Sequence, residues 1–192
     1  MWSAKRVVCL SPYSIYYYAV NVKVDNLRIV FYPDPVLRRK TQPIAEVDDE
    51  VRAVAGRMLE LMHEARGVGL AAPQVGLNWR MFVANATGDP ADDRVFINPA
   101  LSNPAEEYAP HSEGCLSIPD VTAEIRRPVG ITIDATDLDG NPFTLSDDDL
   151  PARIWQHETD HLEGVLILDR MNPMDKLASR RTLKLLEAEY SG

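Results

Sequence analysis

Apolar and polar positions recur along this chain with two different periods, which predict short strands and longer helices. Alternating apolar and polar residues, and short apolar runs bounded by turn residues, are typical of strands. We expect strands at 29–31, 81–84, 95–97, 129–135 and 142–145. Asp139-Gly140 lies between the last two and is typical of a hairpin turn. The expected sheets are therefore small.

Three stretches have the spacing of helices instead. The first runs from 48 or 49, where an aspartate can cap it, to about 66–67. The second is expected to begin near Asp147, because Ser146 and Asp149 resemble a capping box. The third opens at Asn172 and is followed by a proline suited to a first turn. Its predicted packing positions are Leu177, Leu183 and Leu186.

The second helix carries residues that can bind a metal ion. His157 and His161 stand four residues apart and share one helix face, and Glu158 follows the first of them. Apolar residues on both sides predict that the helix is buried: Ile154, Trp155, Leu162, Val165, Leu166, Ile167 and Leu168. Buried polar groups need partners, and a metal ion supplies one. The HExxH spacing thus predicts a metal hydrolase in which Glu158 lies beside a water on the metal.

A catalytic metal needs a third protein ligand. Ile167 stands where the metzincin proteases have a third histidine, which argues against that class. Cys115 is the preferred candidate, because a thiolate with two imidazoles suits iron(II), zinc, nickel or cobalt. Glu187 and Glu189 are alternatives, although they belong to a charged helix whose acids are expected to be solvated.

Composition narrows the class of protein. The 192 residues, 45% of them hydrophobic, are enough for one domain with its own core. The formal net charge of −9 argues against nucleic-acid binding, which requires a basic face. No apolar run approaches the roughly 20 residues of a membrane span. Cys9 and Cys115 do not resemble a disulfide framework, which favours a reducing compartment.

Residues 1–26 differ from the rest, because they are basic, rich in tyrosine and contain no acid before Asp25. Three interpretations have equal weight. The segment is a short organellar transit peptide, an added strand over 15–24, or an upstream start that is rarely used. A single catalytic domain is then expected at 27–192.

A glycine-rich stretch, GVGLAAPQVG, occupies 67–76. Its first two glycines allow a ligand to approach the backbone, and the Gln74 amide can both donate and accept hydrogen bonds. The spacing matches neither GxGxxG nor the phosphate-binding P-loop. By itself this stretch predicts only a tight turn after the first helix.

Three separated runs together resemble one family. GVGLAAPQVG at 67–76, EGCLS at 113–117 and QHETDHLEG at 156–164 resemble the signature motifs of peptide deformylases, in the same order. LRIVFYPDPVLR at 27–38 resembles the usual beginning of that family. The resemblance implies an α+β fold in which small mixed or antiparallel sheets pack around a central helix carrying HExxH, with a C-terminal helix.

The resemblance also implies an activity, the removal of the formyl group from the N-terminal formylmethionine of newly made polypeptides, with release of formate. Cys115, His157 and His161 then match the ligands of one metal ion per chain, usually Fe²⁺, with Zn²⁺, Ni²⁺ and Co²⁺ as alternatives. Glu158 matches the general base and acid that serves a metal-bound hydroxide attacking the formyl carbon. An iron(II) site with a thiolate ligand is vulnerable to oxidation, so we expect oxygen-sensitive activity.

Other roles follow from the same resemblance. Gln74 and the backbone N–H of Leu116 match the pair that stabilises the oxyanion. Gly69 matches a position that pairs with the substrate backbone. The pocket for the methionine side chain is expected to be lined by Ile154, Leu150 and Leu116.

Residues beside the candidate ligands are expected to support them. Glu113 and Asp160 are expected to orient a ligand histidine or to hold the neighbouring loop. Arg127 is preferred over Arg126 as the partner of Asp160. His63, on the first helix, is expected to be a surface or half-buried residue rather than a ligand.

The expected partners are N-formylmethionyl peptides and nascent chains, with transient contact with the ribosome as an additional option. Neither nucleic acid nor a membrane is expected to bind, and both a monomer and a homodimer remain open. The expected location is the cytoplasm, or a plastid or mitochondrion if residues 1–26 are a transit peptide. Two other functions remain: a zinc peptidase with a conventional third ligand in place of Cys115, and a non-enzymatic module that binds nascent N-termini or the ribosome surface.

Overall fold

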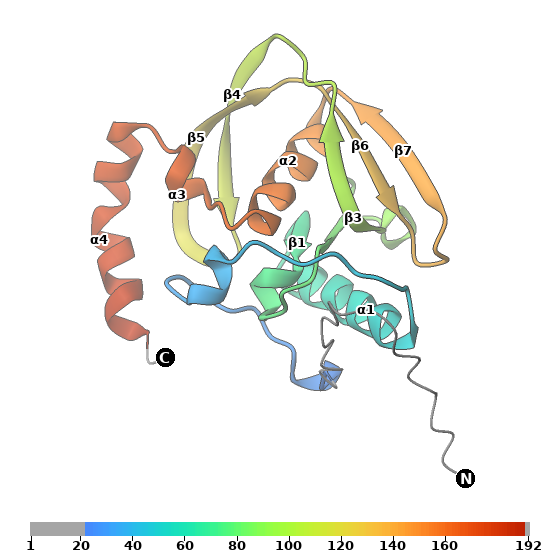
Figure 1. The fold of residues 1–192 in the computed structure, drawn as a ribbon. Helices are drawn as coiled ribbons and strands as arrows, with labels where there is room; N and C mark the ends of the chain where they lie inside the picture. The colour runs from blue at the N-terminus through green and yellow to red at the C-terminus, as the bar shows by residue number, and fades with distance from the viewer. Residues whose placement is uncertain (1–21, 191–192) are drawn as a thin grey trace, which may run out of the picture.

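The computed structural model describes residues 22–190, in which seven strands form two antiparallel sheets around one central helix. The helices are α1 (Asp49–Glu64), α2 (Leu150–Leu162), α3 (Ile167–Arg170) and α4 (Pro173–Glu189). Figure 1 shows α2 in the middle of the molecule, between the two sheets. This arrangement confirms the predicted α+β class, and His157, Glu158 and His161 all lie on α2.

The larger sheet has the strand order β1-β2-β3-β6-β7. Its strands are β1 (Gly69–Ala71), β2 (Met81–Ala84), β3 (Arg94–Ser102), β6 (Ile131–Thr136) and β7 (Pro142–Asp147). The smaller sheet consists of β4 (Tyr108–Cys115) and β5 (Ile118–Pro128). Of the two expected kinds of sheet, mixed or antiparallel, the structure has the antiparallel kind. Among the described residues, parallel pairing is limited to an isolated bridge between Gln42 and Trp79.

The sequence did not predict β4 and β5, although β5 has a clear alternation. Val121, Ala123 and Ile125 are buried, and the next inward position is occupied by Arg127. A charged residue at an inward position breaks the apolar pattern that identifies a half-buried strand. The arginine is tolerated there because acidic side chains from other elements bind it.

Helix α2 is fixed in the centre by an aromatic cluster on the larger sheet. Phe82 and Phe96 stack with ring centroids 4.6 Å apart, and Trp155 of α2 lies 6.0 Å from Phe96. The predicted burial of Ile154 and Trp155 is confirmed. Each buried side chain of this size stabilises the fold by about 1.5–3 kcal/mol, so the apolar face of α2 holds its polar face in one position.

The start of α2 differs from the prediction. The helix begins at Leu150 rather than near Asp147, and the proposed capping box is wrong. Ser146 and Asp147 belong to β7, where they pair with Thr132 and Ile131 of β6. The local sequence favoured a helix start, but pairing with β6 continues the strand through both residues.

The other helix ends follow the sequence more closely. Asp48 caps α1, since its Oδ1 accepts a hydrogen bond from the N–H of Val51 at 2.9 Å. Helix α1 ends two residues before the expected boundary. Asn172 caps α4 through Asp175 N–H at 2.9 Å. Leu183 and Leu186 of α4 pack beside β5 and α3 as predicted, whereas Leu177 is 65% exposed.

The beginning of the described chain is extended but does not form the strand predicted at 29–31. Val30 N–H donates to Gln74 O at 2.8 Å, and Tyr32 N–H donates to Ser117 O at 2.9 Å. These residues thus connect two different segments instead of one strand. The strand expected over 15–24 lies largely outside the described residues, and its last residue, Val24, begins a 3-10 turn. Val24 packs on the core.

None of the helices among the described residues is long and apolar enough to cross a membrane.

Candidate active site

Three potential metal ligands converge from two elements. His157 and His161 project from α2, and Cys115 ends β4. One ligand atom from each lies within 4.8 Å of the others, and Cys115 Sγ is 3.3 Å from His161 Nε2. Glu187 of α4, an alternative third ligand, instead accepts a hydrogen bond from the hydroxyl of Tyr32. Neither Glu187 nor Glu189 belongs to the cluster found among the described residues.

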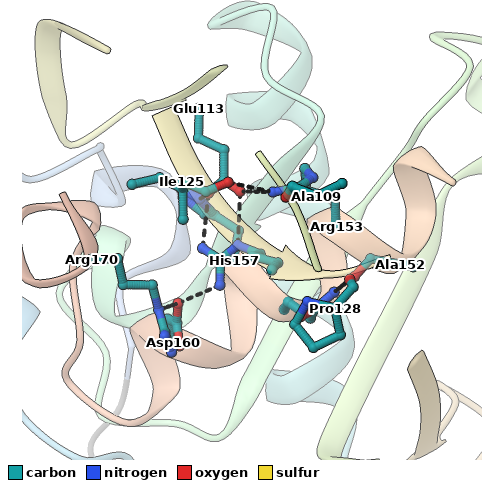
Figure 2. A network of polar contacts seen from close by, with 11 residues as sticks. Ala109, Glu113, Ile125, Pro128, Ala152, Arg153, His157, Asp160 and Arg170 are labelled. Carbon is teal, nitrogen blue, oxygen red and sulfur yellow. Dashed lines mark hydrogen bonds and ion pairs between the residues drawn. The ribbon is translucent and has the colours of Figure 1, made fainter. Parts of the chain in front are cut away.

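His157 is oriented by Glu113. Its Nδ1 lies 3.0 Å from Glu113 Oε2, so Nδ1–H donates to the carboxylate and Nε2 is left for a metal. Glu113 is bound in turn by Arg127, at 2.7 and 2.8 Å. Arg153 binds the same carboxylate at 2.8 Å (Figure 2). Burial opposes ionisation of Glu113, but the hydrogen bonds from Arg127 and His157 outweigh it and hold its pKa well below the usual range.

Arg127 also binds a side chain of α2 itself, that of Asp160. Its Nη1 lies 2.7 Å from Asp160 Oδ2, and Arg170 of α3 binds the same carboxylate (Figure 2). The predicted pairing of Asp160 with Arg127 is confirmed. The Arg126 side chain instead donates to the carbonyl of Tyr108 at 3.1 Å.

Sequence reasoning missed Arg153. Besides Glu113, its guanidinium donates to Ala109 O at 2.9 Å and to Ile125 O at 3.1 Å, which joins α2 to both β4 and β5. An arginine next to apolar residues on a buried helix signals a buried acidic partner, and that signal was present in the sequence.

Glu158 lies against the glycine-rich stretch and is 4% exposed. Burial is the main cause that raises its pKa, to about 7. A Cβ atom at Gly69 would lie only 2.3 Å from Glu158 Oε1, so the carboxylate occupies space that any other side chain would fill. No described residue accepts or donates a hydrogen bond at Glu158 Oε2. A carboxyl group in this setting is suited to exchanging protons near neutral pH.

His161 is held in its neutral form. Burial, followed by the positive charges of His157 and Arg127, lowers its pKa well below the usual value. A neutral imidazole is the form that binds metal ions. The donor chemistry of the cluster, one sulfur and two imidazole nitrogens, therefore fits a transition metal such as iron or zinc.

The glycine-rich stretch, for which the pattern alone predicted a turn, forms β1 and a 3-10 turn at Ala72–Val75. This turn places Gln74 beside the cluster, with Nε2 3.5 Å from Cys115 Sγ and 3.2 Å from Ser117 Oγ. The site residues expected from sequence thus lie together, including Leu116 next to Cys115.

A cavity of about 450 Å³ opens onto these groups. Its lining includes the residues expected around a substrate: Gly69, Gln74, Leu116, Leu150 and Ile154, together with His157 and Glu158. Leu150 is 38% exposed at the edge of the cavity, and Ile154 is buried. His63 does not line this cavity; it is half-buried, as predicted, and pairs with Asp93 at 2.9 Å.

Comparisons with known proteins agree with this geometry. The family model for polypeptide deformylase matches residues 26–177. Peptide deformylase 1B, chloroplastic/mitochondrial, from Arabidopsis thaliana is 43% identical over 175 residues, which cover 90% of this chain and 64% of that protein. Peptide deformylase from Chromohalobacter salexigens is 43% identical over 165 residues, which cover 86% of this chain and 95% of that protein.

Solved structures have the same fold. A crystal structure of Arabidopsis thaliana peptide deformylase 1B in complex with an inhibitor aligns with a TM-score of 0.81 at 43% identity, over 85% of this chain and 92% of that one. This chain spans less than two thirds of the full Arabidopsis protein but nearly all of the bacterial relative. From the matched family model and these relatives, the chain belongs to the polypeptide deformylase family.

Proposed function

We propose that this protein is a peptide deformylase, which hydrolyses the formyl amide at the N-terminal formylmethionine of newly made polypeptides. The observation that carries the proposal is the convergence of Cys115, His157 and His161 beside Glu158, in a chain of this family. Water adds to the formyl carbon, the C–N bond breaks, and the products are formate and a peptide with a free amino group.

Cys115, His157 and His161 would hold one metal ion. The mixed sulfur and nitrogen donor set supports Fe²⁺, with Zn²⁺, Ni²⁺ and Co²⁺ as alternatives. When bound, such a metal makes a water molecule more acidic and polarises the formyl oxygen. Glu113 fixes the direction of the His157 ring through Nδ1, and burial keeps His161 neutral.

Glu158 is the proposed general base and acid. Its ionised carboxylate takes a proton from the attacking water and then delivers it to the departing amine. Its burial and its pKa of about 7 support both steps, because either protonation state is accessible near neutral pH.

Gln74 and the backbone N–H of Leu116 are the proposed donors to the oxyanion. Both residues line the cavity beside Cys115, and one such donor is commonly worth about 3–4 kcal/mol of transition-state stabilisation. We propose that Ile154, Leu150 and Leu116 receive the methionine side chain, while the Gly69 backbone pairs with the substrate.

The proposed partners are formylated nascent chains, and transient contact with the ribosome would bring them to the site. The proposed location is the cytoplasm, with a plastid or mitochondrion as the alternative. The names of the plant relatives place those proteins in chloroplasts or mitochondria, and residues 1–26 here are basic and poor in acids. Both a monomer and a homodimer are compatible with a site built from one chain.

The test is formate release from formyl-Met-Ala-Ser by anaerobically prepared, iron-loaded protein, beside a zinc-loaded sample. We expect rapid release by the iron form, a loss of activity on exposure to oxygen, and no release by Glu158→Ala with its metal retained. Cys115→Ser is expected to bind metal at least about tenfold more weakly, since it replaces a thiolate ligand. Unchanged metal content in Cys115→Ser, together with an absence of formate from every metal form, would instead favour a zinc peptidase or a binding module.

A further inference from the structure

The side-chain amide of Gln74 is held at both ends by groups inside the protein. Its Oε1 accepts a hydrogen bond from Ala71 N–H at 2.8 Å. A backbone N–H can only donate, so this contact determines which end of the amide is oxygen. The nitrogen must then face Ser117 Oγ at 3.2 Å and Cys115 Sγ at 3.5 Å.

The two hydrogens on Gln74 Nε2 point to different acceptors. One is donated to Ser117 Oγ, and the other is directed at Cys115 Sγ, which lines the cavity. The last torsion of a glutamine side chain has a broad energy minimum, so the amide plane can tilt unless a second contact holds it. Ala71 anchors the oxygen, and Ser117 supplies the second contact at the nitrogen.

Ser117 is placed to affect the reaction only through Gln74. It is fully buried, and it neither lines the cavity nor belongs to the cluster of metal ligands. Its main chain is fixed independently of the hydroxyl, because Ser117 O accepts from Tyr32 N–H and Gln74 O accepts from Val30 N–H. Removing the hydroxyl therefore leaves the backbone of both residues in place.

We infer that Ser117 is a positioning residue, whose hydroxyl sets the tilt of the Gln74 amide so that the second N–H is aimed at the oxyanion. The inference rests on the proposed function, and specifically on Gln74 as an oxyanion donor. The hydroxyl is expected to act on the rate of the chemical step and not on metal or substrate binding, because Ser117 belongs neither to the ligand cluster nor to the lining of the cavity.

The experiment is a double-mutant cycle on iron-loaded protein with formyl-Met-Ala-Ser: wild type, Ser117→Ala, Gln74→Ala and the double variant. Ser117→Ala is expected to lower kcat about tenfold, with KM within about twofold and metal content unchanged, because misplacing a catalytic group costs rate. Gln74→Ala is expected to lower kcat about a hundredfold or more. In the Gln74→Ala background, Ser117→Ala should change kcat less than about twofold, since the group that it positions is gone.

Ser179→Ala is the matched control, because Ser179 is also buried but lies on α4 away from the cavity. It should leave kcat unchanged. If Ser117→Ala fails to fold, Ser117→Cys takes its place in the cycle, since sulfur fills a similar volume but accepts hydrogen bonds weakly.

Additive effects of the two substitutions, an unchanged kcat in Ser117→Ala, or a loss of metal in that variant would each overturn the inference. A Gln74→Ala variant with full kcat would overturn it as well, by removing the oxyanion role of Gln74 while deformylation itself stands. An absence of formate release by the wild type in every metal form is the separate result that defeats the proposed function.

Discussion

Two glutamates of the site have opposite proton affinities although both are buried. Glu113 is ionised because two arginines and His157 donate to it, which holds its pKa well below the usual range. Glu158 has no such donors at Oε2, and burial raises its pKa to about 7. Separating the pKa values of two neighbouring carboxyl groups assigns them different tasks. Glu113 is a fixed charge that orients the His157 ring, and the pKa of Glu158 supports its proposed role in proton transfer.

The pH dependence of activity follows from Glu158. Only the carboxylate can accept a proton from water, so kcat/KM should fall as the pH is lowered through the pKa of Glu158. Burial is the main cause that raises that pKa to about 7, and a bound metal would stabilise the carboxylate further, so the midpoint should lie at or below this value. The measurement is kcat/KM for formyl-Met-Ala-Ser across the neutral and acidic range. A profile that stays flat from about two units above to two units below this pKa would contradict the assignment.

The residues of the candidate site were easier to predict than the contacts that hold them in place. His157, His161, Glu158, Cys115 and Gln74 could be identified because motifs fix their spacing, and the structure brings them together. The Arg153 and Ser117 contacts were not predicted, because they join residues 40 and 43 positions from their partners. A local pattern can signal that a buried side chain needs a partner, but which residue it meets depends on how the elements pack.

At the scale of elements, prediction succeeded where local interactions decide the structure. Asp48 and Asn172 cap their helices as expected, and the strands around the Asp139-Gly140 turn were recognised. Prediction failed where a partner far away in the sequence decides the structure. Ser146 remains in β7 because β6 pairs with it, and β5 was missed because Arg127 occupies an inward position.

The cap of α1 provides a test at this scale. Asp48→Ala should lower the free energy of unfolding by about 1 kcal/mol, because the N–H of Val51 loses its acceptor. Asp49→Ala is the matched control, since Asp49 makes only an exposed ion pair with Arg52 and its loss should cost less than about 0.5 kcal/mol. Denaturant unfolding of both variants measures the difference. Equal losses would show that the Asp48 side chain does not act as a cap.

At the scale of the whole molecule, one buried arginine connects the smaller sheet to α2. Arg127 lies on β5 and binds Glu113 of β4 and Asp160 of α2, and Asp160 also binds Arg170 of α3 (Figure 2). Burying these charges is costly, and the attraction between them offsets the cost only while every partner is present. The network therefore makes the relative position of the smaller sheet and α2 specific.

Arg127→Met tests this dependence. The variant leaves the buried Glu113 without its two-point partner and should lower the free energy of unfolding by about 3–5 kcal/mol. Arg126→Met, one residue away and exposed, should change it by less than about 0.5 kcal/mol. Thermal or denaturant unfolding compares the two. A loss as small in Arg127→Met as in Arg126→Met would show that the network contributes little to stability.

The division of the metal ligands between β4 and α2 has a consequence for how the protein itself is made. Cys115 and His161 are 46 residues apart, and the intervening chain forms β5, β6 and β7. A ribosome that has synthesised only the first two thirds of the polypeptide has produced the thiol but neither imidazole. We therefore expect metal uptake to begin only after α2 has been synthesised and has docked beside the smaller sheet.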